Sequence, residues 1–154
     1  MTEKPRDIEA QSVTWLTDAE RQDMDSRREW IYKYPQFFGN AATVEGKLAL
    51  VETVLKDEKA LAGGRYALQC LGIVLGDAIA QAKDMTWYML QSDMGKGPCL
   101  GIPETTVKIV PVTVFADLVA RGDKIDVPDI FNYFTTSVDR LKGEYAAMIA
   151  GPSR

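Results

Sequence analysis

Histidine is absent from the 154 residues of this sequence. In other proteins it is the usual general base at neutral pH and the commonest zinc ligand. For a chain that acts alone, its absence excludes hydrolases with a Ser-His-Asp or Cys-His arrangement, zinc proteases with two helical histidines, and nucleases that depend on histidine. We therefore expect a protein that is not an enzyme, and we predict no cofactor and no metal site.

Cysteine is also scarce. Only Cys70 and Cys99 occur, and their separation does not match the close spacing of metal-binding cysteines. Two free thiols are typical of a protein in a reducing compartment. The first residues, MTEKPRDIEAQS, lack the apolar core of an export signal. The sequence therefore predicts a cytoplasmic protein.

Long apolar runs and a strong excess of one charge are absent as well. The longest apolar stretch, residues 66–80, is shorter than the roughly 20 residues that span a bilayer, and it contains Gln69 and Asp77. The net charge of −4 argues against a surface that neutralises phosphates. We therefore predict no membrane and no nucleic acid as partners, whereas a mildly acidic surface suits a basic protein partner.

The length and the hydrophobic content of 46% suit one domain. Residues 1–13 are polar and irregular, which predicts a flexible N-terminal arm, and residues 14–150 are expected to form a single globular domain. Caps and apolar periodicity predict helices near residues 17–34, 43–62, 65–83, 111–122 and 128–150. Strands are expected at 86–93, 99–102 and 105–111. This order predicts an α+β fold with about five helices packed on a small three-stranded antiparallel sheet.

Two glycines, Gly72 and Gly76, lie inside the helix expected at residues 65–83. Each costs about 1 kcal/mol relative to alanine in a helix interior. A phosphate-binding loop needs its glycines between a strand and a helix, so these positions do not fit one. Glycines four residues apart on one side of a helix let a neighbouring element approach closely, and we predict this packing role.

The segment GKGPCLG, residues 95–101, is the first candidate site because it places Lys96 and Cys99 after Asp93 in a glycine-rich stretch. It lacks the spacing of a phosphate-binding loop, and a hairpin turn explains its composition equally well. A nucleophilic Cys99 would need a base, and without histidine only Lys96 or a carboxylate is available.

Acidic residues recur at Asp117, Asp123, Asp126 and Asp129. They indicate a magnesium site, a patch for a basic partner, or simply the negative charge that a helix N-terminus favours. A second cluster, WIYKYPQFF, gathers Trp30, Tyr32 and Tyr34 with two phenylalanines. Not all of these rings fit a core, so part of the cluster is expected to cover the core and part to form a partner-binding patch.

The segments YALQCLGIVLGDAI and IVPVTVFADLVARGDKIDV, together with Trp87, Asp93 and Gly95, resemble a bacterial family of domains of unknown function, the one numbered 3806. The resemblance covers about residues 65–140. It implies a bacterial origin and one compact domain. The family carries no established activity, so no site residue follows from the resemblance.

These observations predict a non-catalytic protein-binding module, of the immunity or antitoxin type, that neutralises a toxin by binding it directly. The candidate partner-binding residues are Trp30, Tyr32, Tyr34, Asp93, Lys96, Asp117, Asp123 and Asp126. Two alternatives stay open. One is a small-ligand-binding or carboxylate-based enzymatic domain around residues 93–101, and the other is a structural subunit of a homo-oligomer.

Overall fold

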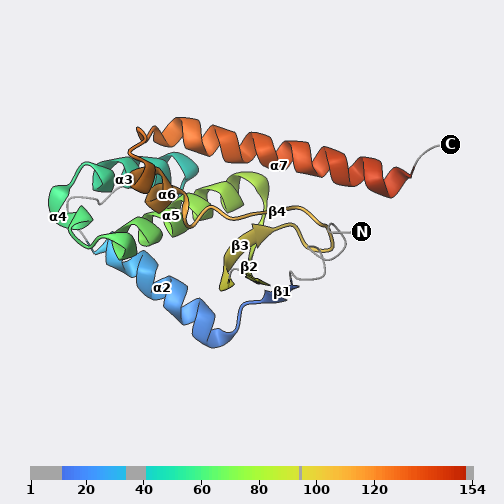
Figure 1. Cartoon of the computed structure of the whole chain (residues 1–154), viewed down its shortest axis with the longest axis horizontal. Helices are drawn as coiled ribbons and strands as arrows, with labels where there is room; N and C mark the ends of the chain where they lie inside the picture. Colours follow the sequence, from blue (N-terminus) through green and yellow to red (C-terminus); the bar gives the residue numbers. More distant parts are fainter. Residues whose placement is uncertain (1–11, 34–40, 94, 152–154) are drawn as a thin grey trace.

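Helix α5 (Arg65–Lys83) lies at the centre of the computed structural model, with the other elements around it (Figure 1). The structure describes residues 12–33, 41–93 and 95–151. Eleven of the 19 residues of α5 are buried, which explains why apolar side chains cover this helix nearly all round. The bounds of α5 are those expected from the sequence.

Five further helices are present in the described part of the chain. They are α2 (Asp18–Tyr32), α3 (Val44–Leu55), α4 (Glu58–Leu61), α6 (Val114–Arg121) and α7 (Val127–Ala150). All five pack against α5. Their ends follow local signals: Thr17 and Glu20 form the predicted capping box of α2, and Thr43 caps α3. Gly122 ends α6 with a left-handed backbone conformation, φ 73°.

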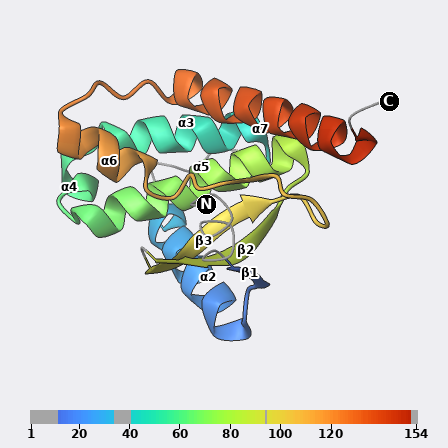
Figure 2. The same cartoon turned by 45° about the vertical axis from the view of Figure 1, so that its right-hand side comes forward.

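Four antiparallel strands form one sheet in the order β1-β2-β3-β4 within the described residues. They are β1 (Ser12–Trp15), β2 (Thr86–Ser92), β3 (Gly95–Gly101) and β4 (Lys108–Ile109). Figure 2 shows the sheet beside α5, with β1 at the edge furthest from α7. The chain is therefore a single α+β domain, as predicted, with one more strand and one more short helix than the sequence indicates.

The additional strand, β1, lies where the sequence predicts the end of a flexible arm. Of the expected arm, residues 1–11 lie outside the described residues, whereas Ser12 and Val13 belong to β1. β1 pairs with β2, and Trp15 lies opposite Tyr88. Four residues of alternating polarity are too short to identify as a strand by themselves, because the partner that stabilises them lies far along the chain.

The strand β3 begins at Gly95, whereas the sequence predicts a strand only from Cys99. It pairs with β2 along its whole length. Gly95, Gly97 and Pro98 have low strand propensity, so the hydrogen bonds to β2 override the local preference.

The strand β4 has only two residues, whereas a strand over residues 105–111 is expected. Thr105 explains the difference, because its hydroxyl donates to the carbonyl of Ile102 and accepts from the N–H of Val107. These bonds hold residues 102–107 in a turn, which leaves Lys108 and Ile109 to pair with β3.

The two glycines of α5 serve close packing, which confirms the prediction. A Cβ at Gly72 would clash with the main chain of Val112, 2.7 Å from its carbonyl carbon. A Cβ at Gly76 would clash with the ring of Trp87, 2.5 Å from Cζ2. The missing methyl groups therefore let the β4–α6 connection and β2 lie directly on α5.

Buried side chains form two groups. The larger group surrounds α5 and includes Leu71, Leu75, Phe115 and Val138. The smaller group joins α2, α5, β2 and the β4–α6 connection, and consists of Leu16, Met24, Ile73, Met89 and Val112. Its members Met24, Ile73, Met89 and Val112 form the floor of a groove described below.

Helix α7 begins on the core and ends beyond it. Phe134 and Val138 are buried, whereas Met148, on the same face, is 59% exposed. Figure 1 shows the C-terminal end of α7 extending past the sheet. No helix in the described part of the chain has the length and apolar character needed to cross a membrane.

Candidate functional site

The aromatic residues near the end of α2 mostly cover the core. Trp30 packs edge-on against Tyr66, with ring centroids 5.9 Å apart, and both Trp30 and Tyr32 contact the larger buried group. Burial raises the pKa of Tyr32 above its usual value. Tyr34 lies outside the described residues. Trp30 and Tyr32 are therefore half-buried side chains that cover part of the core.

The acidic residues of α6 and α7 lie at helix ends. The carboxylate of Asp126 caps α7 by accepting from the N–H of Asp129, which confirms the helix-terminus interpretation for this pair. Asp123 forms an ion pair with Arg121 at 2.9 Å, and Asp117 is exposed on α6. Among the described residues, no group of three or more acidic or cysteine side chains is placed to hold a metal ion.

The three polar residues of the β2–β3 hairpin do not come together. Asp93 is exposed in the turn. Lys96 and Cys99 are three positions apart on one strand, so their side chains point to opposite faces of the sheet. Lys96 lies beside α2, and Cys99 faces away from it in a second groove that includes Trp15. The structure therefore separates the lysine from the thiol that it would have to activate.

Both thiols are buried, and burial raises the pKa of Cys70 and of Cys99 above the usual value. We expect a disulfide reagent such as DTNB to label the native protein only very slowly at pH 8, and to label two thiols per chain at once in urea. Absorbance of the released thiolate measures both rates. A thiol that reacts rapidly in the native protein would show that one cysteine is accessible and activated.

A groove of about 530 Å³ lies between α2, α5, β3 and the β4–α6 connection. We call it the α2–β3 groove. Its floor is the second buried group, with Met24, Ile73, Met89 and Val112. Its polar rim consists of Glu20, Asp23, Arg27, Gln69, Lys96 and Thr113. The volume falls in the range of about 300–1,000 Å³ that is common for small-molecule sites.

Two ion pairs lie along this groove. Lys96 reaches across from β3 and contacts the Glu20 carboxylate of α2 at 3.0 Å. The N–H of Thr17 and the ammonium of Lys96 lower the pKa of Glu20. Further along α2, Arg27 donates to Asp23 and to Gln69, each at 3.0 Å. Glu20 thus ties the N-terminal end of α2 to β3, and Arg27 ties a later turn of α2 to α5.

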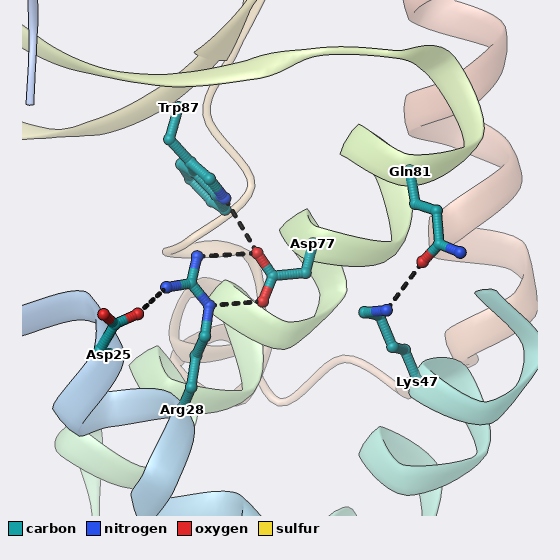
Figure 3. A network of polar contacts seen from close by, with 6 residues as sticks. All are labelled: Asp25, Arg28, Lys47, Asp77, Gln81 and Trp87. Carbon is teal, nitrogen blue, oxygen red and sulfur yellow. Dashed lines mark hydrogen bonds and ion pairs between the residues drawn. The ribbon is translucent and has the colours of Figure 1, made fainter. Parts of the chain in front are cut away.

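A polar network fixes the other half of α2 (Figure 3). Arg28 donates two hydrogen bonds to Asp77 of α5, at 2.7 and 2.9 Å, and a third to Asp25. The indole N–H of Trp87 donates to the same Asp77 carboxylate at 2.9 Å. Although burial alone lowers the pKa of Arg28, the bonds and charges of Asp77 and Asp25 raise it above its usual value. Asp77 therefore joins α2, α5 and β2 at one point.

A second groove, of about 440 Å³, lies on the sheet face that points away from α2. We call it the β1 groove. Its wall is Trp15, which is 64% exposed and packs on Tyr88 with ring centroids 4.9 Å apart. Val13, on the same strand face, is 41% exposed. Neither residue is among the candidates predicted from the sequence. The signal for them is the polar-apolar alternation of Ser12–Trp15, which is too short to identify a strand by itself.

Comparison with family models matches residues 47–131 to a family described as a domain of unknown function, DUF3806. The matched segment runs from α3 into α7 and includes Asp77, Trp87 and Lys96. Searches of curated proteins and of solved structures found no match. The match covers more than half of the chain and includes most of the segment whose motifs carry the resemblance, so this protein belongs to the DUF3806 family.

Proposed function

We propose that this protein is a non-catalytic protein-binding module that holds an extended segment of a partner along β1. The observation that carries the proposal is the exposure of Trp15 on a strand at the edge of the sheet, directly beside the β1 groove. Tryptophan is enriched among the residues that dominate binding energies at interfaces. An edge strand also offers unpaired N–H and C=O groups to another chain.

The chemistry of β1 supports a partner with apolar side chains at alternate positions. Within the described residues β1 pairs only with β2, so its outer edge is free to accept a strand. Side chains of an added strand that point to the same face as Val13 and Trp15 would pack against these two exposed side chains. Exposed carboxylates such as Asp117 and the net charge of −4 favour the approach of a basic partner.

We propose further that the partner is a toxin and that this chain neutralises it in the cytoplasm by occlusion, as an immunity protein or antitoxin does. The small size and the acidic balance of the chain support this role. The two buried free thiols fit a reducing compartment.

Affinity purification from the native host tests this proposal with three forms of the tagged chain: wild type, Trp15→Ser and Tyr133→Ser. Tyr133 is a matched control, because it is 67% exposed but lies on α7. We expect a stoichiometric partner to stay bound to wild type and Tyr133→Ser through a high-salt wash, and to be lost from Trp15→Ser. The same partner should be toxic when it is expressed without this chain.

The possible results of this purification test the protein-binding function and the role of Trp15 separately. If no partner is retained by any form, the protein-binding function is wrong. If Trp15→Ser retains the partner, the module binds through another surface. Light scattering tests the alternative of a homo-oligomer. If wild type is a dimer and Trp15→Ser is a monomer, the segment that binds β1 belongs to a second copy of this chain.

A further inference from the structure

The α2–β3 groove has an apolar floor without an aromatic ring. Met24, Ile73, Met89 and Val112 are each less than a tenth exposed, and they come from four different segments of the chain. Methionine side chains are flexible and adapt to the shape of an apolar ligand. A floor of methionine and branched aliphatic side chains fits an alkyl chain, because it offers no flat surface on which a ring would stack.

The rim of the groove has unused hydrogen-bond donors. An ammonium group has three N–H donors and a guanidinium has five. Among the described residues, Lys96 contacts only Glu20, and Arg27 uses two of its N–H groups on Asp23 and Gln69. The amide nitrogen of Gln69 donates to no described side chain.

The acceptors of the rim are largely occupied. One oxygen of Glu20 accepts from the N–H of Thr17 and the other faces Lys96. Asp23, which accepts from Arg27, is mostly exposed to water. Each cation of the rim thus already faces a carboxylate, but each keeps N–H groups that no described residue accepts, and a ligand carboxylate can accept from these groups in place of water.

We infer that the α2–β3 groove binds an alkyl carboxylate. The alkyl chain lies over the apolar floor of the groove beside Met89, Pro98 and Val112, and the carboxylate accepts hydrogen bonds from Lys96. Lys96 is the better of the two cations for this role, because its side chain is about half exposed and only one partner competes for it. This inference does not rest on the proposed protein-binding function, because the β1 groove lies on the opposite face of the sheet.

Isothermal titration calorimetry of the full chain with octanoate and with 1-octanol tests the inference, since the two probes share a chain and differ in charge. We expect wild type to bind octanoate more tightly than 1-octanol. Lys96→Met should weaken octanoate binding roughly tenfold, the loss expected for one charge-assisted hydrogen bond, and should leave 1-octanol binding unchanged.

Glu20→Gln should change octanoate binding in the opposite direction. Glutamine keeps the capping box of α2 but no longer pairs with the charge of Lys96, so octanoate should bind several-fold more tightly. Lys108→Met is the matched control, because it removes the same charge on the opposite face of the sheet and should change nothing.

Thr113→Phe tests the location of the site. Thr113 is exposed at the rim and its hydroxyl makes no capping bond, so a larger side chain there fills the groove without disturbing the core. We expect it to abolish binding of both probes while the thermal unfolding curve is unchanged. The inference is overturned if neither probe binds, if Lys96→Met and Lys108→Met weaken octanoate equally, or if Thr113→Phe leaves octanoate binding intact.

Discussion

Replacing Gly72 with alanine is expected to lower the free energy of unfolding by about 3 kcal/mol, the upper part of the range for overpacked cores. The new methyl group would meet the main chain of Val112, with its Cα only 2.8 Å away. A backbone obstacle cannot rotate away as a side chain can. The β4–α6 connection must therefore move off α5, and part of the second buried group moves with it.

Urea unfolding followed by circular dichroism measures this loss. For a chain of this size, 3 kcal/mol corresponds to a fall in Tm of roughly 6 to 12 °C. Gly143→Ala is the control, because Gly143 lies in α7 with no atom near the position of its missing Cβ. That change should raise stability by about 0.5–1 kcal/mol. A Gly72→Ala protein as stable as wild type would mean that α5 and residue 112 are not packed at this distance.

Replacing Asp77 with alanine is expected to have the second large effect. It should lower the free energy of unfolding by about 2–4 kcal/mol. The change leaves Arg28 with Asp25 as its remaining carboxylate partner, and it leaves the indole N–H of Trp87 without an acceptor. Both groups are partly buried, so water replaces the lost carboxylate incompletely. The loss should appear as a lower urea midpoint and as a shift in tryptophan fluorescence.

Two further variants test whether the Asp77 carboxylate is the group that holds α2 on α5. Asp25→Asn removes only the exposed member of the network and should cost less than about 1 kcal/mol. The double variant Arg28→Met with Asp77→Leu removes both partly buried charges, so it should be more stable than Asp77→Ala alone. If Asp77→Ala and Asp25→Asn lose the same stability, the Asp77 carboxylate does not hold α2 on α5.

The helices follow from local sequence because their determinants are local. Thr17 with Glu20, Thr43 and Gly122 mark helix ends through bonds or backbone angles within a few residues. The apolar periodicity of residues 65–83 predicts α5 without knowledge of its neighbours. The strand β2 is also predicted, because its aromatic and long apolar residues form a compact run.

The candidate site is harder to predict from the sequence than the helices are. Lys96 and Cys99 stand close together in the chain, but the alternation of side chains in β3 sends them into two different grooves. Lys96 instead meets Glu20, 76 positions earlier, across the α2–β3 groove. The sequence predicts that part of the aromatic cluster covers the core, and only the packing of α2 on α5 shows that Trp30 and Tyr32 do so.

The sequence by itself determined the α+β class, the central helix, the N-terminal caps of α2 and α3, the C-terminal end of α6 and the packing role of Gly72 and Gly76. These features depend on residue type, spacing and caps within one or two turns of chain. Only the tertiary structure decided that Ser12–Trp15 is an edge strand, that Asp77 joins three elements, and that two grooves lie on opposite faces of the sheet. The reason is physical: each of these features is a contact between residues distant in the chain, and its free energy exists only once the elements have packed.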